Sequence, residues 1–133
     1  MIVTDRKPLG VIKAQLEEIN AKRIAVIACN ACARICGTGG DKGLEEVSEA
    51  LKKEGFNIAY KNVIPIMCDI DMIKKQINLE GDIDAIVSLG CAAGSFSLRK
   101  VFQDIPVIDG LDTIGVGARD EKGDIYVVKE VKR

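Results

Sequence analysis

The stretch IAVIACNACARICGTGG, residues 24–40, decides the fold class. Its first five residues are all apolar, which is typical of a short strand that is covered on both faces in a parallel sheet. The loop that follows holds three cysteines and three glycines, namely Cys29, Cys32, Cys36, Gly37, Gly39 and Gly40. Open α/β sheets bind their ligands at the carboxyl ends of the strands. We therefore expect this loop to contribute to a ligand site.

The other two cysteines of the chain follow apolar runs as well. Cys68 follows the run at residues 63–67, and Cys91 follows the run at residues 85–90. If the strands are parallel neighbours, all five thiols gather at one edge of the sheet. Thiolate is the soft ligand that selects iron–sulfur clusters, zinc or Cu(I). The sequence thus predicts a metal site, and its candidate ligands are Cys29, Cys32, Cys36, Cys68 and Cys91.

Strands and helices alternate along the rest of the chain. The apolar pattern predicts helices over residues 7–20, 41–54, 70–77 and 95–102, and strands over residues 24–28, 56–67, 83–89 and 105–108. Residues 113–131 are expected to form a β-hairpin with its turn at residues 120–123. We expect one α/β domain over residues 1–133. Its doubly wound, mostly parallel four-stranded sheet would have the flavodoxin-like order 2-1-3-4, with a C-terminal β-hairpin.

Composition narrows the classes of function. The net charge is −1 and no basic stripe occurs, which argues against nucleic-acid binding. No apolar run approaches the length of about 20 residues that a membrane span requires, and no apolar segment follows a basic start, so we expect a cytoplasmic protein. In that compartment thiols stay reduced, which favours metal binding or catalysis over a disulfide framework.

The chain contains no histidine, which excludes Ser-His-Asp and Cys-His catalysis. Only 4% of the residues are aromatic, so there is little to stack against a flavin ring or a base. Three acidic residues follow predicted strands, namely Asp69, Asp109 and Asp112, and helix capping or turn formation explains them. We expect no catalytic residue in this chain.

Several interpretations of the cysteine pattern remain open. Four thiolates complete either a [4Fe–4S] cluster or a tetrahedral zinc site, and five are available. Cys29 and Cys32 also form a Cys-x-x-Cys pair like that of thiol redox proteins. Gly37, Gly39 and Gly40 match a dinucleotide fingerprint only weakly, so we expect them to let the backbone fold closely over a cofactor and donate N–H groups to its sulfurs.

The motifs together resemble a known family, the small iron–sulfur partner subunit or C-terminal domain associated with methylenetetrahydrofolate reductase in acetogens and related anaerobes. The resemblance runs through Cys29-x2-Cys32-x3-Cys36-x-Thr38-Gly39-Gly40, Cys68-Asp69, the stretch LGCAAG at residues 89–94, and Leu111-Asp112-Thr113. It covers most of the chain, to about residue 117.

This resemblance implies an iron–sulfur protein, most simply with one [4Fe–4S] cluster, that carries electrons for, or assembles with, a flavin-containing methylenetetrahydrofolate reductase or a related one-carbon enzyme. The five cysteines would be the candidate cluster ligands. Longer family members continue into a second cysteine-rich region, whereas this sequence ends at Arg133. We therefore expect a single-cluster or accessory role. The alternatives are a zinc-stabilised protein-interaction module and a thiol redox protein that uses Cys29 and Cys32.

Overall fold

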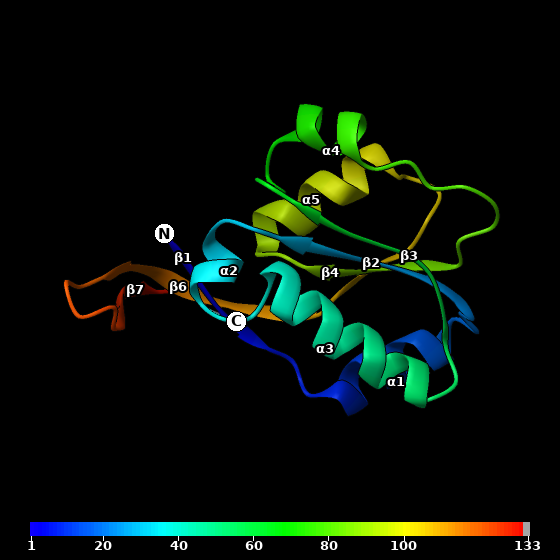
Figure 1. Ribbon diagram of the computed structural model, residues 1–133, viewed down its shortest axis with the longest axis horizontal. Coiled ribbons are helices and arrows are strands. Elements are labelled where there is room, and N and C mark those ends of the chain that lie inside the picture. Colours follow the sequence, from blue (N-terminus) through cyan, green and yellow to red (C-terminus); the bar gives the residue numbers. More distant parts are fainter. Residues whose placement is uncertain (132–133) are drawn as a thin grey trace.

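A four-stranded parallel sheet forms the centre of the protein. The computed structural model describes residues 1–131 (Figure 1). The strands of this sheet lie in the order β3-β2-β4-β5, and their bounds are β2 (Arg23–Cys29), β3 (Asn57–Ile64), β4 (Ala85–Leu89) and β5 (Val107–Asp109). All neighbouring pairs are parallel. The expected α/β class with a parallel sheet is therefore confirmed.

Helices cover both faces of this sheet. α1 (Leu9–Glu18) and α3 (Gly40–Lys53) lie on one face, and α4 (Ile70–Gln76) and α5 (Ala92–Val101) lie on the other (Figure 1). The short helix α2 (Cys32–Ile35) lies beyond the end of β2. Because both faces are covered, residues 24–28 of β2 are entirely buried, which explains why this stretch is apolar throughout.

The strand order is not the predicted 2-1-3-4. The chain begins with a strand that the pattern analysis did not predict, β1 (Ile2–Arg6), so the parallel sheet contains the second to fifth strands of the chain. β1 belongs to a separate antiparallel sheet of order β1-β6-β7. It was missed because it is short, ends in two charged residues, and pairs with a segment more than a hundred residues away.

The predicted C-terminal hairpin is present as part of this second sheet. β6 (Leu111–Arg119) and β7 (Ile125–Glu130) pair in antiparallel fashion, and the turn between them includes Asp120 and Gly123, whose N–H donates to the Asp120 carbonyl. β6 follows β5 after a single residue, Gly110. The antiparallel sheet therefore extends from the carboxyl end of the parallel sheet, on the side where α2 lies (Figure 1).

Several element boundaries differ from the predictions. The helix predicted over residues 41–54 begins one residue earlier, at Gly40, with Gly39 as its N-cap, and Asp41 lies in its first turn. The strand predicted over residues 56–67 is shorter, since β3 runs from Asn57 to Ile64. α5 begins at Ala92, three residues earlier than predicted. Asp69 does cap α4, because its carboxylate accepts hydrogen bonds from the next helical N–H groups.

None of the helices in residues 1–131 has both the length and the apolar character that crossing a membrane requires.

One carboxylate ties the amino-terminal edge of the parallel sheet together. Asp84, just before β4, accepts hydrogen bonds from the backbone N–H groups of Arg23 and Lys22, at 2.9 and 2.8 Å. These two hydrogen bonds lower the pKa of Asp84 below its ordinary value. A carboxyl group whose pKa is depressed by folding stabilises the fold above its unfolded-state pKa. That contribution is lost as the pH falls through the folded-state pKa.

We therefore predict that Asp84→Asn lowers the urea midpoint of unfolding at neutral pH. The difference in midpoint between this variant and the native chain should shrink at about pH 3, below the ordinary aspartate pKa. Urea unfolding at both pH values measures this. Asp82→Asn is the matched control, because the side chain of Asp82 makes no such backbone contacts among the described residues. A deficit of equal size at both pH values would contradict the role assigned to the Asp84 charge.

Candidate metal centre

The cysteines lie at the carboxyl edge of the parallel sheet, where three strands end level with one another. Cys29 is the last residue of β2 and pairs with Ile64, the last residue of β3. The preceding residue of β2, Ala28, pairs with Leu89 at the end of β4. Cys68 and Cys91 follow these two neighbouring strands, so the expected convergence on one edge is present for the strand ends.

Cys68 lies within electrostatic range of three other thiols. Although Cys68 is an exposed residue, partial burial of its thiol raises its pKa, and the neighbouring thiols of Cys91, Cys29 and Cys32 raise it further, in that order. A neighbouring thiolate has this effect because a like charge disfavours the ionised form of Cys68. Cys68 therefore lies in a group of thiols contributed by three strand-to-helix connections.

Cys36 is directed elsewhere. Its thiol donates a weak hydrogen bond to the backbone carbonyl of Ile2 in β1, at 3.7 Å. It does not contribute to the shifted pKa of Cys68, whereas Cys32, one helical turn earlier, does. The structure thus separates the loop cysteines into two that face the other strand ends and one that faces the antiparallel sheet.

Three of the gathered cysteines stand at the beginnings of helices. Cys32 is the first residue of α2, Cys91 is the N-cap of α5, and Cys68 immediately precedes Asp69, the N-cap of α4. The first N–H groups of a helix lack intrahelical acceptors and carry partial positive charge.

Beneath the thiols lies a closely packed floor. The buried side chain of Met67 fills the space under Gly90 and Gly94, where an added Cβ would lie 2.8 and 3.1 Å from its atoms. Ser97 of α5 donates to the carbonyl of Cys68 at 3.3 Å. These contacts fix the connection that carries Cys68 against α5. The sequence pattern did not single out Met67, because a buried methionine resembles any other core residue.

The glycines of the cysteine loop serve its packing. A Cβ at Gly39 would lie 2.7 Å from the Cβ of Ala33 and 2.9 Å from the carbonyl oxygens of Cys29 and Leu89, so only glycine fits between the ends of β2 and β4. Gly37 and Gly40 adopt positive φ angles of 73° and 65°. These positions explain the glycines sterically, and the expected contact with a cofactor stays a prediction.

Thr38 fastens the loop to β1. Its hydroxyl forms a buried 2.7 Å hydrogen bond with the hydroxyl of Thr4 and a 3.1 Å hydrogen bond to the carbonyl of Ala33. On the other side of the site, the hydroxyl of Thr113 in β6 accepts from the N–H of Ala92, next to Cys91. Two strands of the antiparallel sheet, β1 and β6, thus each form a hydrogen bond that holds a cysteine-bearing loop in place.

The acidic residues near this edge have structural partners. Asp69 caps α4, Asp109 forms a 3.0 Å ion pair with Arg99, and Asp112 lies 3.8 Å from Lys7. The expectation that these carboxylates are structural is therefore consistent with the structure.

Among residues 1–131, no three cysteine or carboxylate side chains are arranged to hold a metal ion. In donor chemistry and in number, the four cysteines at this edge match the ligands of either a [4Fe–4S] cluster or a tetrahedral zinc ion.

In comparisons with protein-family models, with curated proteins and with solved structures, nothing matches this chain.

The close fit of Gly39 gives a stability prediction. We expect Gly39→Ala to lower the free energy of unfolding by about 1–3 kcal/mol, the usual cost of overpacking, because its Cβ would meet two backbone carbonyls. Urea unfolding of the reduced, metal-free chain measures this. Gly10→Ala is the control, since its Cβ would meet no atom within 4 Å and alanine favours the helix by about 1 kcal/mol. Equal stability of Gly39→Ala and the native chain would contradict the packing described for the loop.

Proposed function

We propose that this chain binds one [4Fe–4S] cluster through Cys29, Cys32, Cys68 and Cys91. We further propose that it serves as an electron-transfer or accessory subunit of a methylenetetrahydrofolate reductase-type one-carbon enzyme. The observation that carries the proposal is the gathering of four thiols from three separate strand-to-helix connections, with Cys68 in electrostatic range of the other three. Soft sulfur donors of this number suit an iron–sulfur cluster.

The environment of the thiols favours a cluster over a redox dithiol. A reactive Cys-x-x-Cys pair needs an accessible thiolate, yet Cys29 is only 8% exposed. Two further cysteines would also have no role in a dithiol mechanism. A cluster at this edge uses both and links β2, β3 and β4 through their carboxyl ends.

Charge at the site also fits the proposal. Four thiolates bring several negative charges to one edge of the sheet. The beginnings of α2, α4 and α5 direct partial positive charge to the same edge. When bound, the cluster would supply one-electron chemistry, and the chain's own residues would supply its ligands, its charge compensation and a packed floor around Met67.

The accessory role is supported by what the chain carries and by the motifs it shares with the resembled family. Only 4% of its residues are aromatic, and no flavin-binding motif occurs in the sequence, so chemistry on the folate would belong to the flavin of a partner reductase. A cytoplasmic location follows from this assignment, because such an enzyme works on soluble one-carbon carriers.

Metal analysis after purification without oxygen tests the cluster. We predict roughly four irons with matching sulfide per chain, as one cubane cluster requires, and a brown colour that bleaches on reduction. Serine substitution at position 29, 32, 68 or 91 should each remove most of the iron.

Cys36→Ser is the matched control and should retain a full iron content, because Cys36 faces Ile2 rather than the other thiols. Loss of iron in this variant to the same extent as in Cys32→Ser would overturn the proposed ligand set. Stoichiometric zinc without iron after anaerobic reconstitution would replace the redox proposal with a structural zinc module.

The partner is tested separately. We predict that the cluster-loaded chain co-elutes with a flavin-containing methylenetetrahydrofolate reductase of the same organism on size-exclusion chromatography, and that reduced flavin bleaches the cluster absorbance within the complex. A loaded chain that neither co-elutes nor exchanges electrons with the reductase would leave the cluster intact as a proposal but would overturn the assignment to this enzyme.

A further inference from the structure

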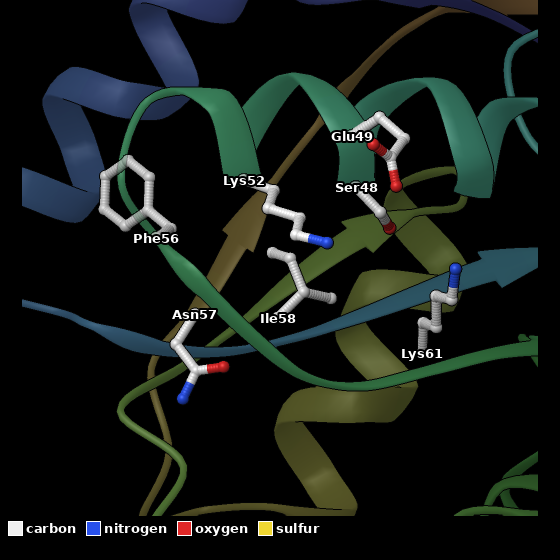
Figure 2. A pocket seen from close by; sticks show the side chains of 7 residues that line it. All are labelled: Ser48, Glu49, Lys52, Phe56, Asn57, Ile58 and Lys61. Atoms are coloured by element: carbon white, nitrogen blue, oxygen red, sulfur yellow. The ribbon is translucent and has the colours of Figure 1, made fainter.

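A second concave site lies between α3 and the beginning of β3, far along the strand from the cysteines. Figure 2 shows this cavity of about 330 Å³, which is lined by side chains from the second half of α3 and from residues 56–61. Small-molecule sites occupy about 300–1,000 Å³. The cavity is therefore large enough for a small organic ligand, and it does not depend on the proposed cluster.

A buried hydroxyl in this cavity has no partner. Ser48 is only 3% exposed, and its Oγ makes no hydrogen bond to any residue between 1 and 131. Figure 2 shows its hydroxyl directed from α3 toward the strands below. A buried polar group without a partner destabilises the fold, so native proteins rarely keep one without a reason. A polar atom of a ligand in the cavity would satisfy it.

The rim of the cavity carries an unpaired cation. Lys52, one turn after Ser48 on α3, extends over the cavity (Figure 2) and forms no ion pair within the described part of the chain. Lys61 also lines the cavity, but both oxygens of Glu45 already hold its ammonium at 2.8 and 2.9 Å. Glu49 is the one carboxylate in the lining, and Figure 2 places it at the end opposite Phe56. Lys52 is thus the group available to an anion.

Apolar surface completes the cavity at its other end. Phe56 is 9% exposed and belongs to the core, and the partly buried Ile58 packs against the same core. The lining of the cavity therefore combines apolar surface, a buried hydroxyl and an ammonium group. This combination suits a ligand with a short apolar body and one anionic group.

We propose that the cavity between α3 and β3 binds a small amphipathic carboxylate. The apolar body would lie on Phe56 and Ile58, the carboxylate would pair with Lys52, and one of its oxygens would accept a hydrogen bond from Ser48.

Titration of the full-length ¹⁵N-labelled chain with 4-phenylbutyrate, followed by amide correlation spectra, tests this proposal. We expect saturable shifts centred on Ser48, Lys52 and Ile58, with a dissociation constant of about 1 mM. The uncharged analogue 4-phenylbutanol should bind about fivefold more weakly, as should Lys52→Gln, since an exposed ion pair contributes up to about 1 kcal/mol.

Two variants separate binding from folding. Ser48→Ala should bind the carboxylate about fivefold more weakly, the effect of one hydrogen bond. It should keep or raise the urea midpoint, because it removes a buried hydroxyl that has no partner. Lys53→Gln, the adjacent lysine outside the cavity, should bind like the native chain. Absence of saturable shifts, equal binding of the acid and the alcohol, or equal weakening by the Lys52 and Lys53 substitutions would overturn the proposal.

Discussion

The parallel pairing of β2 with β3 and β4 is the constraint on which the rest of the structure depends. Parallel neighbours have their carboxyl ends at the same edge, and the register places Cys29 opposite Ile64 and Ala28 opposite Leu89. The connections that follow must therefore begin side by side. Each of them leads into a helix, so the same edge collects cysteine side chains and helix N-termini together. The chemistry proposed for the chain follows from this alignment.

Much of this arrangement could be predicted from residue pattern alone. The uniformly apolar run at residues 24–28 predicts a doubly covered strand, because only a central parallel strand buries both faces. Cysteines after three such runs predict a shared edge. By contrast, the grouping of four thiols around Cys68 depends on side-chain directions at strand ends and on Met67, which fills the space under Gly90 and Gly94. No period or spacing in the sequence encodes those directions.

The features that the sequence analysis missed have a common physical cause. A local residue pattern does not show which distant segments will contact a given stretch in the folded chain. β1 is too short to be predicted by alternation, and it is stabilised by pairing with β6 across almost the whole chain. α3 begins at Gly40 rather than at residue 41, and its N-cap Gly39 is the residue that fits between the ends of β2 and β4, which are distant in the sequence. Likewise, the cavity under α3 joins Ser48 to residues that begin the next strand, and only the folded chain brings them together.

The antiparallel sheet, which lies outside the parallel core, explains why the proposed ligand set leaves out one cysteine of the loop. The carbonyl of Ile2 accepts a hydrogen bond from the thiol of Cys36. The hydroxyl of Thr4 forms a hydrogen bond with the hydroxyl of Thr38, two residues after Cys36. These two contacts draw the end of α2 toward β1 and leave Cys32, at the beginning of α2, beside the other strand ends. In the proposed ligand set, a loop of three closely spaced cysteines thus contributes two ligands rather than three. Cys68 and Cys91 complete the set of four because β3 and β4 flank β2 on both sides.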